Sequence, residues 1–455
     1  MSKPNSTSLP RLKTAVLVFL LLVWWAMTGW LARDVHRWAI QLTTYCVAVG
    51  LVGFYVIGWV IAIDGSGSSR RRMQFRAIGT TLVGLAIAMI LESAALIGVV
   101  DYSEVWSRLT GEWAGPSTNY QTDYEFGFRH PSNTKWYGRP RSDMAVTWNL
   151  TVRRPAPMTF TTDSRGFRNL HERPTADVVL LGDSYVEGAY VSDDENCAAV
   201  LERDFGLKVT NLALAGYGTL QELEVLKRLA VPMKPRLIAW FFFEGNDLYD
   251  DEGFEGSLPY LRERKPYHAG RWDWSWNDFL NRSFIRTTFR TVRRGLDPLV
   301  PNNVATFGTF RDANGIDHRM YFYDYASIGL DDYELQRFEK SKAAFRIGRQ
   351  MCDENGISLV LFYIPMKFRV YGDFCKYPPG SLCREWKPWK LADHFREFCK
   401  RESQPFVDLT EPMKAQAAAG KLLYAPEDSH WGIEGQKFVA NSVLKQWEIF
   451  VRTEK

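Results

Sequence analysis

The sequence predicts an α/β fold, a parallel sheet with helices on both faces, placed after three transmembrane helices. Three observations predict it. Long apolar stretches occupy most of the first 100 residues. From Asp177 onward, short apolar runs alternate with helical patterns, which is the order of a parallel sheet with crossover helices. Polar or glycine-containing segments follow several of these runs, where such sheets bind their ligands.

Composition narrows the classes of function. The chain has 455 residues, 46% of them hydrophobic, which is enough for a packed core. A formal net charge of +4 is too small to indicate nucleic acid as a partner. No spacing of cysteines and histidines fits a zinc site, so we expect neither a metal nor another cofactor.

Three apolar stretches are long enough to cross a bilayer: Thr14 to Ala32, Ala39 to Ile63 and Ile78 to Val100. They have 19 to 25 residues, and a helix rising about 1.5 Å per residue crosses a hydrocarbon core of roughly 30 Å within that length. The first also resembles a signal peptide, but no small-x-small cleavage site follows it. We therefore expect a membrane anchor with three spans over residues 1–103.

The basic residues around these stretches predict the orientation. Arginines cluster between the second and third spans, at Arg70, Arg71, Arg72 and Arg76. The positive-inside rule places that loop and the N-terminus in the cytoplasm. Everything after about Asp101 is then periplasmic or at the cell surface. Glu92 lies inside the third span, where helix packing or contact with a partner is favoured over direct chemistry.

Five of the six cysteines follow the spans, where disulfides are permitted. Cys375 and Cys383 flank a short Pro-Gly segment and can pair. Cys352 and Cys399 fall on neighbouring predicted helices and can also pair, which would leave Cys197 free. The sequence does not determine the connectivity.

Residues 104–172 are expected to form a β-rich lead-in, in which Met144 to Val152 and Met158 to Thr162 are candidate strands. The α/β domain follows over residues 173–455. Its expected strands are Asp177 to Leu181, Lys208 to Leu214, Arg236 to Phe243, Ser358 to Ile364 and Pro405 to Leu409. Its expected helices are Cys197 to Phe205, Thr219 to Leu229, Leu330 to Asn355, Leu391 to Lys400 and Ile433 to Val451.

An aromatic and arginine-rich segment, about 248–328, interrupts this alternation and is expected to be an insertion over the active face. Within it, Phe279 to Arg294 has arginines interleaved with apolar residues. The pattern fits a solvated helix, and it also fits contact with lipid head groups or an anionic glycan.

Three distant blocks contain the parts of a serine acyl-transfer site: Gly182-Asp183-Ser184, Gly245-Asn246-Asp247 and Asp428-Ser429-His430. Each block alone is typical of a turn, but their order and their position at strand ends favour a common site. Ser184 is the candidate nucleophile and His430 the base that activates it. Asp428 can orient the imidazole, and Glu427 is the alternative for this role.

Acyl transfer also needs donors for the oxyanion. The candidates are the backbone N–H groups of Ser184 and Gly216 and the side-chain amide of Asn246. The loss of one such donor typically costs about 3 kcal/mol of transition-state stabilisation.

This set resembles the SGNH (GDSL-type) hydrolase superfamily, whose four named residues would be Ser184, Gly216, Asn246 and His430. The resemblance covers about Asp163 to Trp447 and implies a three-layer α/β/α domain. The segment Asp163 to Asn169, before the first strand of the α/β domain, resembles the corresponding segment of membrane-associated members. The segments Ile364 to Tyr371 and Asp428 to Trp431 resemble the alginate O-acetyltransferase-like branch. Many secreted members have aspartate three residues before the histidine, where this chain has Glu427.

The site, its expected exterior location and the resemblance together indicate an O-acetyltransferase or acetylesterase that acts on a cell-surface glycan such as an exopolysaccharide. The resemblance implies an acyl donor, a polysaccharide acceptor and a membrane-bound O-acyltransferase as a partner, beside membrane lipid. Two alternatives remain. One is a non-catalytic glycan-binding or assembly protein on the same fold, favoured by the aromatic insertion. The other is a lipid esterase, favoured by the arginine-rich stretch.

Overall fold

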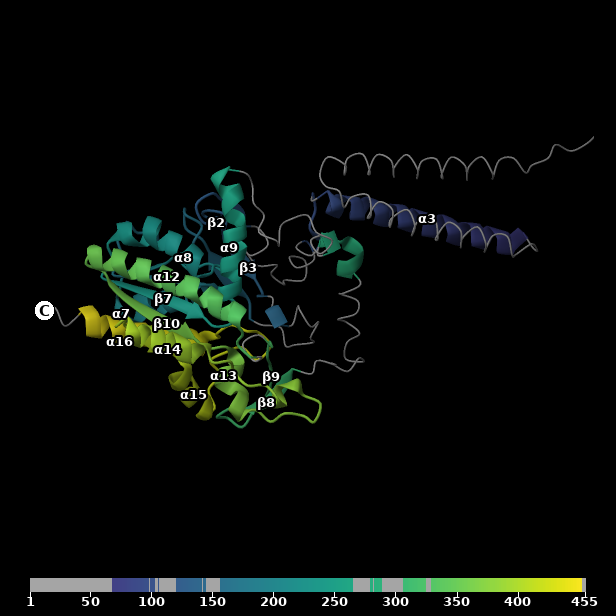
Figure 1. The fold of residues 1–455 in the computed structure, drawn as a ribbon. Helices are drawn as coiled ribbons and strands as arrows, with labels where there is room; N and C mark the ends of the chain where they lie inside the picture. The colour runs from purple at the N-terminus through teal and green to yellow at the C-terminus, as the bar shows by residue number, and fades with distance from the viewer. Residues whose placement is uncertain are drawn as a thin grey trace, which may run out of the picture. The chain divides into compact units, whose positions relative to one another are not determined.

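The computed structural model describes two compact units (Figure 1). One is drawn from Met1–Trp106 and Arg271–Arg293, and the other from Ser107–Gly270 and Arg294–Lys455. The described residues are 68–97, 99–102, 105, 120–140, 142–144, 156–264, 279–280, 282–288, 306–324 and 329–451. The first two expected spans, most of the expected strand Met144 to Val152 and the last arginines of the 279–294 stretch lie outside them.

The first unit contains α3 (Ser68–Leu96), which covers most of the third expected span. Oε1 of Glu92 accepts hydrogen bonds from the Ser283 hydroxyl, at 2.9 Å, and from the Ile285 N–H. Ala95, Leu96 and Phe279 form a small buried cluster beside it. Glu92 therefore joins α3 to part of the expected insertion. Within the described part of the chain, no helix combines the length and apolar character needed to cross a membrane.

A five-stranded sheet forms the centre of the second unit, in the order β11-β10-β7-β5-β6, and all its pairings are parallel. The strands are β5 (Val178–Leu181), β6 (Val209–Asn211), β7 (Leu237–Phe243), β10 (Ser358–Ile364) and β11 (Phe406–Asp408). Every residue of β5 and β7 is buried, as expected for central strands covered on both faces. The predicted α/β domain with a parallel sheet is confirmed.

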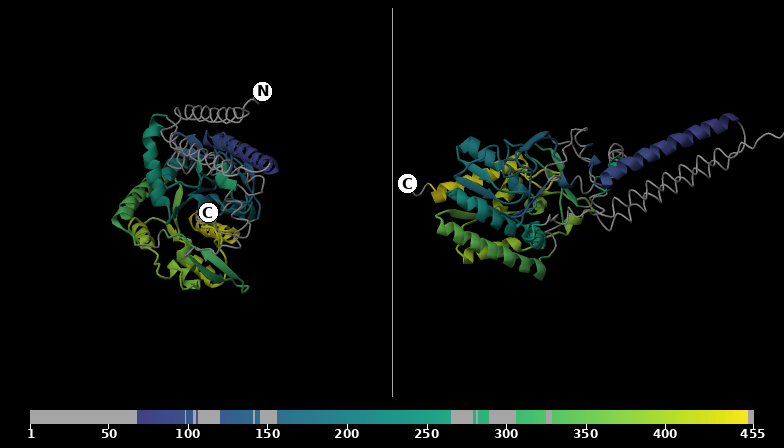
Figure 2. Two further views of the ribbon diagram at one scale, coloured as in Figure 1. Left: turned by 90° about the vertical axis from the view of Figure 1, so that its right-hand side faces the viewer. Right: turned by 90° about the horizontal axis from the view of Figure 1, so that it is seen from above.

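Helices cover both faces of this sheet (Figures 1 and 2). Side chains alternate along β7, so Trp240 and Phe242 point to one face, where Phe242 contacts rings of Phe345 and Phe395. These rings belong to α12 (Asp332–Glu354) and α14 (Leu391–Arg401). Helix α12 also contacts α8 (Thr219–Val225) and α9 (Asp247–Arg262). A second group contains α7 (Cys197–Phe205) and α16 (Ile433–Val451), which contact each other, and α16 also contacts β7.

The lead-in forms two antiparallel strand pairs. β1 (Gln121–Asp123) pairs with β2 (Gly127–Arg129), and β3 (Lys135–Gly138) pairs with β4 (Met158–Thr161). The sequence suggested the segment beginning at Met144 as the partner of β4, whereas the described partner is β3. Trp136 lies opposite Phe160 in this pair with ring centroids 5.7 Å apart, a cross-strand aromatic contact that stabilises the register.

The expected insertion contributes to both units. Residues 248–262 lie in α9, in the second unit. Residues 282–288 belong to the first unit. The strands β8 (Phe307–Arg311) and β9 (Asp317–Tyr321) form a hairpin in the second unit. The hairpin bridges to the main domain through Thr309 and Lys376. At its end, the Tyr321 N–H donates to the Pro426 carbonyl at 3.0 Å, which attaches the hairpin to the segment that carries His430.

The five cysteines among the described residues are free thiols, so neither disulfide considered from the sequence is formed. Cys352 and Cys399 are buried in the apolar core, where a thiol serves as a small apolar side chain. Burial raises the pKa of both to about 12, which favours the protonated thiol over the reactive thiolate. Cys375 and Cys383 are likewise unpaired, and Cys197 is free as expected.

Candidate active site

The candidate nucleophile lies at the carboxyl end of a central strand. β5 ends just before Gly182-Asp183-Ser184, and Ser184 is the first residue of α6 (Ser184–Glu187). Asp183 is its N-cap residue, and Oδ1 of Asp183 accepts from the Tyr185 N–H at 3.0 Å. The helix ends at Gly188 with φ +83°, where a Cβ would lie 2.8 Å from Cβ of Asn196. The cap residue and the glycine fix the two ends of this short helix, and the side-chain amides of Asn211 and Gln436 donate to the carbonyl groups of Val186 and Tyr185 between them.

His430 connects the nucleophile to a carboxylate. Its Nε2 lies 2.8 Å from the Ser184 hydroxyl oxygen, and its Nδ1 lies 2.6 Å from Oδ1 of Asp428. With Nδ1–H donating to Asp428, Nε2 is free to accept the hydroxyl proton. The structure thus places three of the predicted site residues in one hydrogen-bonded relay, although Ser184 and His430 are 246 positions apart.

The two carboxylates before His430 have different partners. The Tyr190 hydroxyl donates to Oε1 of Glu427 at 2.8 Å. Asp428 contacts both the imidazole and the backbone N–H of His430, the latter at 2.9 Å. Of the two candidates that the sequence left open, the structure pairs Asp428 with the histidine.

The candidate oxyanion donors follow three adjacent strands. Because β5 lies between β6 and β7, the residues that follow these parallel strands meet at one edge of the sheet. Ser184 follows β5, Gly216 follows β6 and Asn246 follows β7. Among the described residues, neither the Ser184 nor the Gly216 N–H donates to a protein acceptor. Both backbone donors are thus available to a ligand.

Asn246 is partly engaged within the protein. Its Nδ2 donates to Oδ2 of Asp250 at 2.5 Å, and its buried Oδ1 has no partner among the described groups. A side-chain amide has two hydrogens, so one remains for an oxyanion. Gly216 has φ +85°, a conformation that disfavours other residues. The three donors can therefore serve the role predicted from the sequence.

Charge at the site favours the imidazolium. Burial alone would lower the pKa of His430, but the carboxylates of Asp428, Asp143 and Asp183 outweigh it and raise the pKa to about 9. Burial alone would raise the pKa of Asp428, yet His430 holds it below its ordinary value. At neutral pH the resting histidine is therefore protonated and must lose this proton before it can act as a base.

Lys367, in the segment Ile364 to Tyr371, supports the loop that carries Asp428. Its buried Nζ donates to the carbonyl oxygens of Ala425, Pro426 and Asp428, at 2.9, 3.0 and 2.7 Å. Burial lowers the pKa of Lys367 to about 8, although nearby carboxylates oppose the shift. The sequence resemblance includes this segment, but it implies no role for the lysine.

A buried ion pair joins the ends of β7 and β10. Glu244 accepts from Nε and a terminal nitrogen of Arg369, at 2.7 and 2.6 Å. The Tyr363 hydroxyl and the Met366 N–H also donate to the same carboxylate, at 2.6 and 2.8 Å. A buried pair with this many hydrogen bonds is specific in geometry, so it fixes the strand end that precedes Asn246. The sequence contained no signal for this pairing.

A third carboxylate, Asp143, also lies at the site. Its N–H donates to Oδ2 of Asp428 at 2.8 Å, and its own carboxylate accepts from the N–H and hydroxyl of Ser429. Carboxylate and imidazole atoms of Asp143, Asp428 and His430 lie within 4.8 Å of one another, a spacing that can hold a cation. Both ring nitrogens of His430 already contact Asp428 and Ser184, so the arrangement fits a proton relay better than a metal centre.

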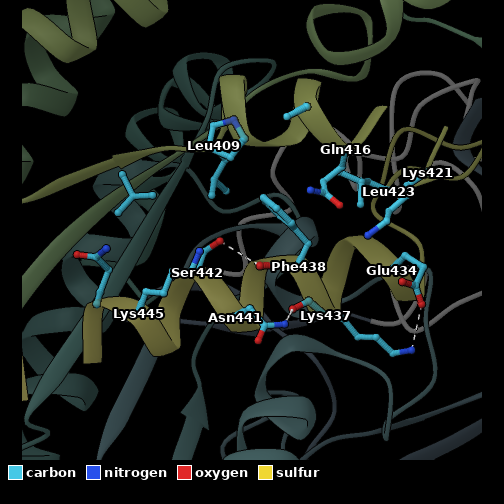
Figure 3. Close-up of a pocket in the computed structure, with 14 residues that line it drawn as sticks. Leu409, Gln416, Lys421, Leu423, Glu434, Lys437, Phe438, Asn441, Ser442 and Lys445 are labelled. Atoms are coloured by element: carbon cyan, nitrogen blue, oxygen red, sulfur yellow. Dashed lines mark hydrogen bonds and ion pairs between the residues drawn. The ribbon is translucent and has the colours of Figure 1, made fainter. Parts of the chain in front are cut away.

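A separate pocket of about 610 Å³ lies between α15 (Thr410–Ala418), α16 and the end of β11 (Figure 3). Leu409, Leu423 and Phe438 form apolar parts of its wall, and Lys421 and Lys445 also line it. None of the relay residues lines this pocket, so it is not the place where the relay would act.

Comparison with known proteins gives structural similarity alone. No family model matches the chain. No curated protein matches it. Similar solved structures include a GDSL-like lipase from Bacteroides thetaiotaomicron, with 10% identity over 60% of this chain and 87% of that chain and a TM-score of 0.29. The lipase/acylhydrolase from Enterococcus faecalis has 14% identity over 60% and 94%, with a TM-score of 0.30.

An acetylxylan esterase from Geobacillus stearothermophilus has 11% identity over 59% of this chain and 93% of that chain, with a TM-score of 0.31. The chain is thus similar in structure to GDSL-type lipases, acylhydrolases and acetylxylan esterases over about 60% of its length. Identities and TM-scores this low do not transfer a function, which has to be inferred from the site itself.

Proposed function

We propose that this chain is a membrane-anchored, extracytoplasmic serine acyl-transfer enzyme, an O-acetyltransferase or acetylesterase that acts on a cell-surface glycan. One observation carries the proposal. The Ser184 hydroxyl, the His430 imidazole and the Asp428 carboxylate form a continuous relay with contacts of 2.8 and 2.6 Å at the carboxyl edge of the sheet. Such a relay turns a weak hydroxyl nucleophile into one that attacks acyl carbons.

The first half of the reaction forms an acyl-enzyme. Nε2 of neutral His430 takes the hydroxyl proton as the Ser184 oxygen attacks the carbonyl carbon of the acyl donor. The oxyanion that develops is stabilised by the N–H groups of Ser184 and Gly216 and by the Asn246 amide. The bond to the leaving alcohol then breaks, and His430 returns the proton to that alcohol.

The second half discharges the acyl group. A water molecule or a sugar hydroxyl approaches the acyl-Ser184 ester, and His430 takes a proton from it. The new bond forms, Ser184 leaves and regains its proton from His430. Water gives an esterase and a sugar hydroxyl gives a transferase, with the same protein residues in both cases.

The cellular location and the glycan acceptor have other support. Arg70, Arg71, Arg72 and Arg76, which lie in the first turns of α3, favour a cytoplasmic start of this helix and hence an exterior location for the relay. The glycan acceptor, and the membrane-bound partner that would supply acyl groups, rest on the resemblance of the segments around Lys367 and His430 to the alginate O-acetyltransferase-like branch.

Intact-mass spectrometry tests the proposal directly. The detergent-purified protein is incubated with 4-nitrophenyl acetate, beside Ser184→Ala, His430→Ala and the control Ser442→Ala. Ser442 lies on α16, and among the described residues its hydroxyl bonds to the Phe438 carbonyl of the same helix. We expect one acetyl adduct on Ser184 in wild type and the control, and none at this position in the other two variants.

Addition of acetylatable oligosaccharides then separates the two reactions. Transfer of the adduct to sugar identifies a transferase, and loss to water at the same rate with and without sugar identifies an esterase. If Ser184 of the wild-type protein is never acylated by any activated ester, the chain is not a serine acyl-transfer enzyme, and a glycan-binding role takes its place.

A further inference from the structure

The segment before the α/β domain places a carboxylate against the catalytic loop, residues 425–430. Asp143 contacts this loop in three ways, through its N–H to Asp428, and through its carboxylate to the N–H and the hydroxyl of Ser429. The preceding residue adds a fourth contact, because the Ser142 hydroxyl donates to the Glu427 carbonyl. Two adjacent residues thus bind three consecutive residues of the loop.

These contacts act on the relay from the side opposite Ser184. Oδ1 of Asp428 binds His430, whereas Oδ2 accepts the N–H of Asp143, so the carboxylate is held at both oxygens. Ser429 joins the two residues of the relay and is itself bound at its N–H and its hydroxyl. Rotation of the Asp428 carboxylate or of the backbone at Ser429 would break these bonds.

We propose that Asp143 is a positioning residue of the acyl-transfer site, which fixes Asp428 and Ser429 and adds a second negative charge that stabilises the imidazolium of His430. This inference rests on the proposed function. Asp143 does not touch the nucleophile, and it acts through the residues of the catalytic loop, Asp428, Ser429 and His430.

The charged groups around this position are all from the second unit. His430, Asp428 and Glu427 belong to the catalytic loop, Lys367 approaches from α13 (Lys367–Tyr371), and Asp183 lies in the nucleophile turn. Tyr190 faces the same carboxylates. Burial and Asp428 raise the pKa of Asp143 to about 7, and ionised Asp143 in turn raises the pKa of His430. The two groups therefore titrate together.

Asp143→Asn removes the charge and keeps the shape. Asparagine Oδ1 can still accept the Ser429 N–H, and the Ser429 hydroxyl can rotate to accept from Nδ2. With one negative charge fewer, the pKa of His430 falls, and neutral His430 appears at lower pH. A residue with a purely structural role would change the rate or Tm without moving this titration.

The rate of Ser184 labelling by a fluorophosphonate probe, measured from pH 5 to 10 on the full chain in detergent, gives the readout without a known substrate. We expect the acid limb of Asp143→Asn to lie at lower pH than that of wild type by about half a unit or more. Asp143→Ala, which also loses both acceptors for Ser429, should label about 10- to 100-fold more slowly at the alkaline plateau. The control is Asp123→Asn, a lead-in carboxylate that binds its own turn, and it should match wild type.

The outcomes separate the two proposals. If wild-type Ser184 is not labelled at any pH, the proposed function fails. If wild type is labelled and Asp143→Asn has the same acid limb, Asp143 does not act on His430 and the inference fails. Ser429→Ala gives a second test if Asp143→Asn does not fold. It removes one bond to Asp143 and keeps the carboxylate, so labelling at the alkaline plateau should slow about 3- to 10-fold. A wild-type rate would overturn the inference.

Discussion

The turn that carries Ser184 forms a short helix with its own cap residue, whereas the loop that carries His430 forms no helix. Distant side chains bind both segments, since Gln436 and Asn211 donate to carbonyl groups of the turn and Lys367 donates to those of the loop. Asp183 caps the short helix at Ser184, and Gly188 ends it. The catalytic loop instead depends on Lys367 for three of its carbonyl groups and on Asp143 for its serine. Lys367 and Asp143 lie more than 50 positions from the groups they bind, and the loop adds a short-range bond from the Ala425 N–H to the His430 carbonyl.

This difference separates two ways of losing activity. The Asp183 cap fixes the start of the helix at Ser184, so the nucleophile keeps part of its local support when a distant contact is lost. The loop that carries the base has less regular local structure, because residues 425–430 form no helix or strand and are closed by the Ala425 N–H to His430 carbonyl bond beside the bridge between Tyr424 and Trp431. Substitution of Lys367 or Asp143, which bind the loop, should therefore damage the base more than the nucleophile. The following predictions test this contrast.

The largest effect is expected at Asp428. Asp428→Asn replaces the acceptor for Nδ1–H with an amide that favours the wrong tautomer of His430, so kcat should fall about 10⁴-fold. The measurement is kcat for ester hydrolysis or, without a substrate, the rate of Ser184 labelling. Glu427→Gln is the matched control and should cost less than about 10-fold, because Glu427 binds Tyr190 instead. A greater loss in Glu427→Gln than in Asp428→Asn would identify Glu427 as the supporting carboxylate.

The second prediction concerns the turn after β7, which contains Asn246. Asn246→Ala removes one oxyanion donor, so kcat should fall about 10²- to 10³-fold while the adduct on Ser184 still forms. The measurement is the kcat of acetyl transfer or hydrolysis. Asp250→Asn leaves the Asn246 amide in place and should cost only a few-fold. Equal losses in the two variants would show that the turn matters for its fold and not for its donor.

The smallest effect on rate is expected at Lys367. Lys367→Met removes three bonds to the catalytic loop, so kcat should fall about 10- to 100-fold as the relay loses its alignment. The measurement combines kcat with Tm. Lys437→Met is the matched control, since Lys437 is half exposed and pairs with Glu434 on its own helix. An unchanged kcat in Lys367→Met would mean that the loop holds its shape without distant support, and the contrast between turn and loop would not stand.

The same contrast explains what the sequence could predict. All five strands of the sheet were predicted within a few residues, because buried parallel strands are short apolar runs bounded by polar ones. Ser184, Asp428 and His430 were recognisable because the nucleophile follows such a run and the other two are close neighbours. Their convergence is a consequence of the parallel order, which places strand ends at one edge.

The supports of the loop were not predictable, for a physical reason. Asp143 precedes the α/β pattern, and nothing in its own surroundings distinguishes it from a solvated turn residue. Lys367 reads as a surface lysine, although three carbonyl groups make its burial possible. The absence of disulfides was equally hidden, because cysteine spacing does not reveal whether a thiol faces a partner or an apolar core.

The distance in sequence between Ser184 and His430 has a consequence for the growing chain. A ribosome makes the protein from its N-terminus, so the strand and turn that carry Ser184 emerge 246 residues before the histidine. During this interval the hydroxyl has no base and remains an ordinary alcohol. The nascent chain therefore does not react with activated acyl groups. Its nucleophile becomes reactive only when the segment that contains His430 has been made and has folded against it.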